Sequence, residues 1–314
     1  MGYDSDPGGI RVVGNRSVSV VLMSLMACGG TAPTPSMPEE NVEGAPTIDI
    51  VALSEPAAFL GHHLMADIGR VERVAPPTAD PLAWQPQAVE VAALVAFDVI
   101  VANGAGLEAW RSSAVLPETR LVDSSRDVQL LMHQEPEHAH PGADPHHHET
   151  PNPYTWLDPI GFARQAKTVA GALSAAAPEQ VETLGKNRDT LIARLKTLHE
   201  QIMASSWATS DAAPFVCRGS VAELASAYFL RRYGKTATPL DACGDVTTLA
   251  TASAGPATLL VDDGAEVAVP AGWTVVVWDP ILTADGPSLN YFARMETNLT
   301  QLGAVPSAER APSR

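Results

Sequence analysis

Aromatic residues and long apolar runs are scarce in this sequence. Phe, Trp and Tyr make up 5% of the 314 residues, and 23 Gly and 26 Pro interrupt the chain. A coiled coil or a fibre is therefore excluded, and a loop-rich α/β protein is expected. No internal apolar run reaches the roughly 18 residues that a membrane-spanning helix needs. The hydrophobic content of 46% allows a buried core, and the length predicts about two domains.

Basic residues are in the minority. There are 20 Lys and Arg against 36 Asp and Glu, which gives a formal net charge of −16 at pH 7. Such a chain lacks the positive surface that follows a phosphate backbone, so no nucleic-acid partner is expected. A cationic ligand is easier to accommodate.

Catalytic signatures are also lacking. The sequence contains no Gly-x-Ser-x-Gly, Gly-x-x-x-x-Gly-Lys, His-Glu-x-x-His or Cys-x-x-Cys. Asp262, Asp263 and Asp279 follow expected strands, but carboxylates are common at strand ends without a catalytic role. We therefore expect that the protein is not an enzyme.

The N-terminal residues are typical of an export signal. Arg11 and Arg16 precede an apolar stretch that ends at Cys28, and a Thr-, Pro- and Ser-rich tether covers residues 28–46. This order predicts a secretory signal over 1–27. The four residues ending at Cys28 resemble the bacterial lipobox, so we expect export to the periplasmic or envelope face with a lipid anchor on Cys28. The alternative is a buried N-terminal strand with an incidental cysteine.

Export would place the other two cysteines in an oxidising compartment. Cys217 and Cys243 have 25 residues between them, and a single pair in an exported chain is most simply a disulfide. Two buried free thiols are the alternative, because the sequence does not fix the distance between the residues.

Strand and helix spacing alternate in both halves of the chain, which predicts βαβ units and mainly parallel sheets. Residues 178–205 predict one long helix, about 40 Å in length, that connects α/β lobes at 47–177 and 206–314. The expected strands are 47–53, 98–102, 215–217, 258–261 and 273–278, and the expected shorter helices are 57–68, 89–97, 224–233 and 289–302.

Six sequence motifs occur in order between about residues 79 and 302, at 79–86, 98–110, 152–159, 228–234, 278–280 and 291–302. Together they resemble the metal-specific solute-binding lipoproteins of ABC importers, which capture Zn²⁺ or Mn²⁺ outside the inner membrane. The resemblance implies two α/β lobes, a rigid connecting helix and one metal site between the lobes. It also implies an ABC permease as partner, and we expect a monomer.

The expected metal ligands are mostly replaced. The family typically presents three His and one carboxylate, a set that suits a borderline cation. Leu82 and Tyr154 stand at the first two His positions, the third falls on Arg218 or Glu223, and only Asp279 is kept. Leu has no lone pair, neutral Tyr is a weak ligand and Arg is permanently charged. An Arg218–Asp279 ion pair could therefore fill the place of the metal.

The histidines are concentrated elsewhere. Residues 133–150 combine six of the nine His with acidic residues and are expected to form a mobile loop, and zinc-specific members of the family carry such a loop at this place. Clustered imidazoles and carboxylates can chelate Zn²⁺ or another divalent metal; the alternative is a solvated loop without a metal role. These histidines are His133, His138, His140, His146, His147 and His148.

The other histidines and the tryptophans are expected to have structural or surface positions. His62 and His63 predict a surface pair on a helix, and His199 a solvated helix face. Trp84, Trp110 and Trp156 are expected to be packing residues.

The sequence thus predicts an exported, lipid-anchored zinc solute-binding protein. The metal would be held by the His-rich loop and weakly in an altered cleft. The alternative is a divergent relative that has lost cleft metal binding and acts as an accessory or interaction protein at the cell envelope.

Overall fold

The computed structural model describes residues 48–66, 68–76, 78–134, 149–205, 215–218, 220–240, 257–261, 269–284 and 289–303. The expected signal 1–27 and tether 28–46 lie outside these residues and stay predictions. In the part of the chain that is described, no helix is both long enough and apolar enough to cross a membrane.

The first sheet is parallel, with the order β2-β1-β3-β4. All four residues of β3 are buried, as expected for a central strand covered on both faces. The expected strands 47–53 and 98–102 are confirmed as β1 and β3. The strands are β1 (Asp49–Ala52), β2 (Arg70–Arg73), β3 (Val99–Ala102) and β4 (Leu121–Asp123).

The second sheet is also parallel, with the order β10-β9-β7-β8. The order is the same as in the first sheet: the first strand in the chain lies between the second and the third, and the fourth joins the third. In such sheets a ligand crevice opens at the carboxyl ends of the two strands where the order reverses. The strands are β7 (Phe215–Arg218), β8 (Ala237–Leu240), β9 (Thr258–Val261) and β10 (Thr274–Val277).

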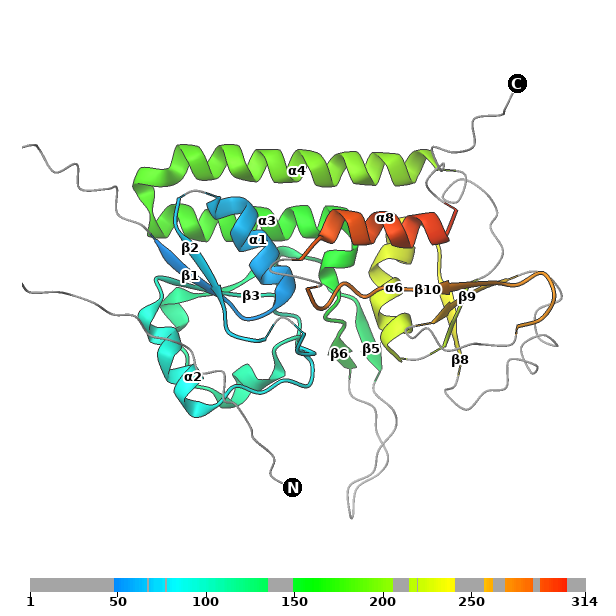
Figure 1. Ribbon diagram of the computed structural model, residues 1–314, viewed down its shortest axis with the longest axis horizontal. Helices are drawn as coiled ribbons and strands as arrows, with labels where there is room; N and C mark the ends of the chain where they lie inside the picture. The colour runs from blue at the N-terminus through cyan, green and yellow to red at the C-terminus, as the bar shows by residue number, and fades with distance from the viewer. Residues whose placement is uncertain are drawn as a thin grey trace, which may run out of the picture. The chain divides into compact units, whose positions relative to one another are not determined.

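The helices flank the sheets, and α4 packs along α3 and α1 (Figure 1). Residues Pro178–Gln180 form a 3₁₀ turn, so the expected long helix begins at Val181 and runs for 24 residues with one apolar, buried face. The α-helices are α1 (Glu55–Met65), α2 (Ala88–Ala93), α3 (Pro159–Ala176), α4 (Val181–Ala204), α6 (Ser220–Arg232) and α8 (Tyr291–Gln301). Other 3₁₀ turns cover Leu94–Ala96, Ala109–Ser113, Glu118–Arg120, Ser124–Asp127 and Thr155–Leu157.

One hydrophobic cluster includes residues of both sheets and of the helices between them. At its centre the Phe162 ring lies 5.5 Å from that of Phe59 and 4.9 Å from that of Tyr291. Residues Gly44–Arg314 form one compact unit. The expected α/β fold is confirmed, while the division into lobes at residues 178–205 stays a prediction.

A short hairpin was not predicted. β5 (Met132–Gln134) and β6 (Glu149–Pro151) pair antiparallel, with His133 opposite Thr150. The expectation that the loop extends over all of 133–150 was therefore wrong at both ends, because cross-strand pairing orders them.

Candidate metal centre

The carboxyl end of β3 carries a buried asparagine that organises its surroundings. Asn103 Oδ1 accepts hydrogen bonds from Thr155 Oγ1 at 3.1 Å and Gln165 Nε2 at 3.0 Å, and its Nδ2 donates to the Pro153 carbonyl at 3.0 Å. Asn103 thereby joins the first sheet to segment 152–159 and to α3. This explains why the asparagine follows the strand directly.

A buried glutamate holds the turn after Asn103. The Glu108 carboxylate accepts from the backbone N–H groups of Asn103 at 2.8 Å and Gly104 at 3.0 Å. Burial raises the pKa of Glu108, and these hydrogen bonds oppose the rise. Gly104 has φ +79°, and a Cβ there would collide with the Asp123 carboxylate.

Segment 152–159 contacts both halves of the molecule. Trp156 Nε1 donates to the Pro280 carbonyl at 3.1 Å, and the Tyr291 hydroxyl donates to the Trp156 carbonyl at 3.0 Å. Tyr154 is fully buried, with its ring 5.3 Å from that of Trp156. Tyr154, which the sequence analysis places at the second expected ligand position, is therefore an aromatic side chain packed in the core.

Asp279 is engaged by an arginine. Its carboxylate accepts from Arg294 Nε and Nη2, each at 2.5 Å, and from the Ile281 N–H at 2.8 Å. Arg294 also donates to the Thr283 carbonyl. The sequence-based hypothesis that Arg218 pairs with Asp279 was wrong, because the first turn of α8 places Arg294 beside the carboxylate. No sequence motif drew attention to Arg294.

The negative charge of a second carboxylate, that of Glu55, is also balanced by an arginine. Glu55, at the start of α1, is 4% exposed and forms an ion pair with Arg73. Burial raises the pKa of Glu55, while the positive charges of Arg73 and Arg294 oppose the rise. Both acidic side chains that could attract a dication here are thus balanced by guanidinium groups.

The other residues at the expected ligand positions supply no imidazole. Leu82 is 39% exposed, and its N–H donates to the Asp80 carboxylate at 2.9 Å. Arg218 ends β7 and is half-buried, and Glu223 is exposed in the first turn of α6. Within the described residues, no group of three or more His, Cys, Asp or Glu is arranged to hold a metal ion.

The β5–β6 hairpin frames the His-rich segment. Thr150 Oγ1 lies 3.0 Å from His133 Nε2, and Gln134 pairs with Glu149 as the last described residues on either side. The Tyr228 hydroxyl of α6 accepts from the Leu131 N–H at 2.9 Å and donates to the Asn152 carbonyl at 3.1 Å. The ends of the segment are therefore held together and fixed to α6. His138, His140, His146, His147 and His148 lie outside the described residues.

Comparison of the sequence with known families identifies the family of this chain. Residues 50–271 match the family described as ZnuA, the periplasmic zinc-uptake complex component A. The chain belongs to this family. ZnuA-type proteins are transport components and not enzymes, in agreement with the lack of catalytic motifs.

Curated relatives are similar over part of the chain. The zinc-binding lipoprotein AdcA of Streptococcus pneumoniae (strain R6) is 26% identical over 190 residues, which cover 58% of this chain and 36% of AdcA. The high-affinity zinc uptake system protein ZnuA of Bacillus subtilis (strain 168) is 21% identical over 228 residues, 71% of this chain and 69% of that protein. The chain thus spans little more than a third of AdcA.

Solved structures share the fold. The metal-dependent lipoprotein YcdH of Bacillus subtilis has a TM-score of 0.65 at 18% identity and covers 82% of this chain and 98% of its own. FpvC of Pseudomonas aeruginosa in complex with Mn²⁺ has a TM-score of 0.66 at 19% identity, over 83% and 99% of the two chains. At this identity the similarity establishes the ZnuA-type fold alone.

Three histidines and three tryptophans outside the His-rich segment were expected to have structural or surface positions. His62 is exposed on α1, as expected, and His63 is half-buried with Nδ1 3.0 Å from the Phe59 carbonyl. The expectation of a solvated His199 was wrong: its ring stacks on Tyr233, with Nδ1 3.1 Å from the hydroxyl. Packing is confirmed for the tryptophans: Trp110 and Trp156 are buried, and Trp84 packs edge-on against Trp110.

Cys217 is buried and carries a free thiol within the described part of the chain. Its expected partner Cys243 is not among the described residues, so the Cys217–Cys243 pairing stays a prediction. Burial raises the pKa of the Cys217 thiol to about 11. Cys28 also lies outside the described residues, so lipidation at Cys28 stays a prediction.

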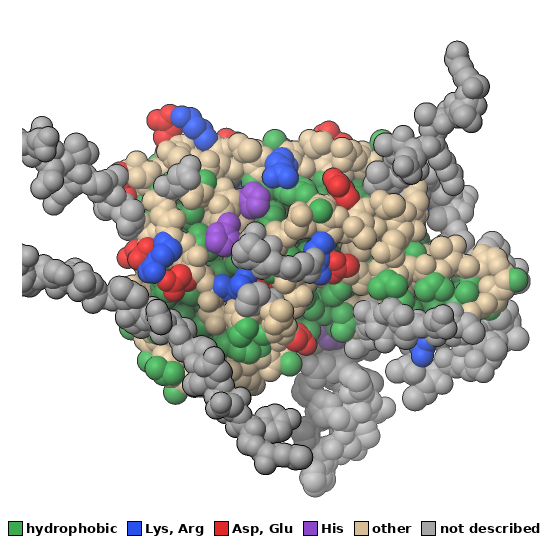
Figure 2. Space-filling model, viewed as in Figure 1, with side chains coloured by type: hydrophobic (Ala, Val, Ile, Leu, Met, Phe, Trp, Pro, Cys, Tyr) green, Lys and Arg blue, Asp and Glu red, His purple; other side chains and the backbone are tan. Residues whose placement is uncertain are grey.

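Charge is not concentrated into one patch on the face drawn in Figure 2, where Lys and Arg side chains alternate with Asp and Glu. Among the described residues, Arg70 forms ion pairs with Asp49 and Glu72.

Proposed function

We propose that this protein is an extracytoplasmic metal-binding protein of an ABC import system, with zinc as its solute and an ABC permease as its partner. The match of residues 50–271 to the zinc-uptake family carries the proposal. Because the chain shares its fold with a Mn²⁺-bound relative, the proposal includes manganese and other divalent metals as solutes. The protein would act as a monomer, outside the cytoplasm, on a lipid anchor at Cys28.

The metal would be bound by the His-rich segment. Leu82 and Tyr154 offer no imidazole, and the Asp279 carboxylate is bound by Arg294, so the position between the sheets is poorly suited to Zn²⁺. The hairpin brings Gln134 and Glu149 together, which closes the segment that carries the histidines. Closing a loop in advance lowers the entropy cost of gathering several ligands around one ion.

Calorimetric titration with Zn²⁺ and Mn²⁺ tests this function. The full chain is compared with a variant in which residues 135–148 are replaced by a short Gly-Ser linker, so that the hairpin is kept. We expect Zn²⁺ binding to the full chain and its loss in the variant. Asp279→Asn should leave binding unchanged, and a His62→Gln/His63→Gln variant controls for histidines outside the segment. Tight one-to-one binding that survives the replacement would contradict the assignment.

A second candidate function is favoured by the Arg294–Asp279 pair itself. A chain whose interlobe carboxylate is already neutralised could serve as an accessory or interaction protein of the envelope without binding metal. If the full chain takes up neither Zn²⁺ nor Mn²⁺ in the same titration, this candidate replaces the first.

A further inference from the structure

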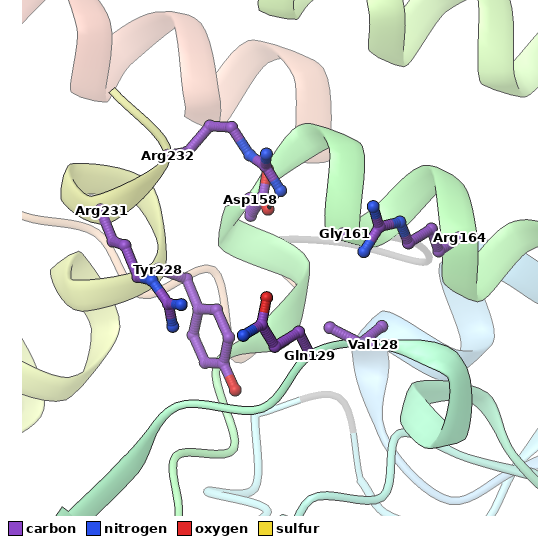
Figure 3. Close-up of a pocket in the computed structure, with 8 residues that line it drawn as sticks. All are labelled: Val128, Gln129, Asp158, Gly161, Arg164, Tyr228, Arg231 and Arg232. Carbon is purple, nitrogen blue, oxygen red and sulfur yellow. Dashed lines mark hydrogen bonds and ion pairs between the residues drawn. The ribbon is translucent and has the colours of Figure 1, made fainter. Parts of the chain in front are cut away.

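A polar pocket lies between α3 and α6, and none of the residues at the expected metal-ligand positions lines it. Its volume is about 200 Å³, and its lining comes from the chain before β5, from the first turns of α3 and from α6 (Figure 3). The polar side chains that line it are Gln129, Asp158, Arg164, Tyr228, Arg231 and Arg232.

The charges around the pocket do not cancel. Arg232 is balanced, because its guanidinium forms a two-point ion pair with the buried Asp158 carboxylate, with Nε 2.8 Å from Oδ1. Arg164 and Arg231 make no ion pair with any described residue. Two guanidinium groups are thus left over at one pocket, in a chain whose net charge is −16. A pocket with this excess charge favours an anion.

The geometry supplies donors from two sides. Arg231 reaches the pocket from α6 and Arg164 from α3, with the Gln129 side chain near the pocket's middle (Figure 3). A guanidinium presents several N–H donors in a planar fork that matches the oxygens of a carboxylate or a phosphate. The Tyr228 hydroxyl is already used by Leu131 and Asn152, so its ring forms a wall of the pocket.

We propose that this pocket binds a small multivalent oxyanion, a phosphate or a polycarboxylate, between Arg164 and Arg231. The volume admits an ion of the size of phosphate or citrate and is too small for a nucleotide. The bound anion would join α3 to α6, on opposite sides of α4 in the sequence. It would also lie against Tyr228, the residue that fixes the β5–β6 hairpin to α6.

The experiment is a calorimetric titration of the full chain, in metal-free Tris–chloride buffer at constant ionic strength, with inorganic phosphate and separately with citrate. We expect saturable one-to-one binding of at least one of them. The Arg164→Gln/Arg231→Gln variant should bind at least about tenfold more weakly, because two charge-assisted contacts are lost. An Arg164→Lys/Arg231→Lys variant, which keeps the charge but not the fork, should fall between the two. The tighter of the two anions distinguishes a phosphate site from a carboxylate site.

The matched control removes two exposed positive charges of α4 that do not line the pocket, Lys186→Gln and Lys196→Gln. Its affinity should stay within about twofold of the unmodified chain, since distant exposed charges are screened. If the lysine control weakens anion binding as much as the Arg164→Gln/Arg231→Gln variant does, the effect is general electrostatic attraction, and the proposed binding site is overturned. Absence of saturable binding of both anions to the full chain would also overturn it.

Discussion

At the scale of single residues, the Arg294–Asp279 pair is the contact that most alters the expected chemistry. Asp279 accepts two guanidinium hydrogen bonds and one backbone hydrogen bond, and the Arg294 side chain is 15% exposed. Replacing Arg294 by Ala leaves a largely buried carboxylate without its counter-charge. We expect Arg294→Ala to lower the free energy of unfolding by about 2 kcal/mol, as measured by urea denaturation.

Arg188 provides the matched control for this substitution. It pairs with Asp189 at 2.9 Å on an exposed face of α4, where the side chains are 39% and 69% exposed. Exposed pairs contribute little, so Arg188→Ala should change stability by less than about 0.5 kcal/mol. If the two variants lose the same free energy of unfolding, the Arg294–Asp279 pair contributes no more to stability than an exposed ion pair.

Cys217 gives a second prediction at this scale. Burial raises the pKa of its thiol to about 11, and thiolate is the reactive form. Near pH 8 the native protein should therefore react with a disulfide reagent far more slowly at Cys217 than the urea-unfolded chain does. Labelling followed by peptide mass mapping measures this rate. Recovery of a Cys217–Cys243 disulfide from the unfolded chain would show that the free thiol is not the native state.

Sequence reasoning at the residue scale found the positions but not the partners. Asp279 was recognisable from the sequence motif 278–280, and the absence of His at Leu82 and Tyr154 was evident from the sequence. Arg294 lies 15 residues after Asp279, and only the packing of α8 against β10 brings the two together. Helical spacing alone does not reveal which distant carboxylate an arginine meets.

At the scale of elements, the β5–β6 hairpin depends on one tyrosine. The Tyr228 hydroxyl contacts Leu131 before β5 and Asn152 after β6, so it holds both ends of the hairpin against α6. Tyr228→Phe removes both hydrogen bonds and leaves the Leu131 N–H without this acceptor. We expect a loss of about 1–2 kcal/mol and faster amide hydrogen exchange at Leu131.

Tyr233→Phe, directly after the end of α6 at Arg232, is the control. Its hydroxyl lies 3.1 Å from His199 of α4, away from the hairpin. Exchange at Leu131 should be unchanged in this variant. Similar acceleration in both variants would mean that α6 as a whole, rather than the Tyr228 hydroxyl, fixes the hairpin.

Strongly apolar elements were predictable and short polar ones were not. The strand 258–261 coincides with β9, and the long helix 178–205 differs from α4 mainly by the 3₁₀ turn at Pro178. β5 and β6 have three residues each, with His, Gln, Glu and Thr among them, so they show no apolar alternation. Their pairing depends on contacts with α6, far away in the sequence.

At the scale of the whole molecule, the half-buried histidines predict how stability depends on pH. Burial lowers the pKa of His63 and of His199 below the ordinary value. The folded state then binds fewer protons than the unfolded chain. The stability that these neutral histidines allow is therefore fully present above about pH 6.5 and is lost as the pH falls below it. In metal-free buffer the His63→Gln/His199→Gln variant should lose less stability than the unmodified chain between about pH 7.5 and 5.5.

The comparison with the double variant is needed because two carboxyls act in the opposite direction. Burial raises the pKa of Glu55 and Glu108, so their protonation favours the folded state as the pH falls. Both proteins share these carboxyls, and the difference between their urea midpoints isolates the histidines. Parallel pH profiles would contradict the assignment of the effect to His63 and His199.

The position of Tyr291 has a consequence for the order in which the chain folds. Each sheet is built from its own stretch of chain, 49–123 and 215–277, so the first can form during synthesis before the second has been made. The Tyr291 ring, however, packs on Phe59 and Phe162 from α8, the last helix among the described residues. A nascent chain that ends before α8 would keep an incomplete aromatic core, so the core should be completed only after α8 has left the ribosome.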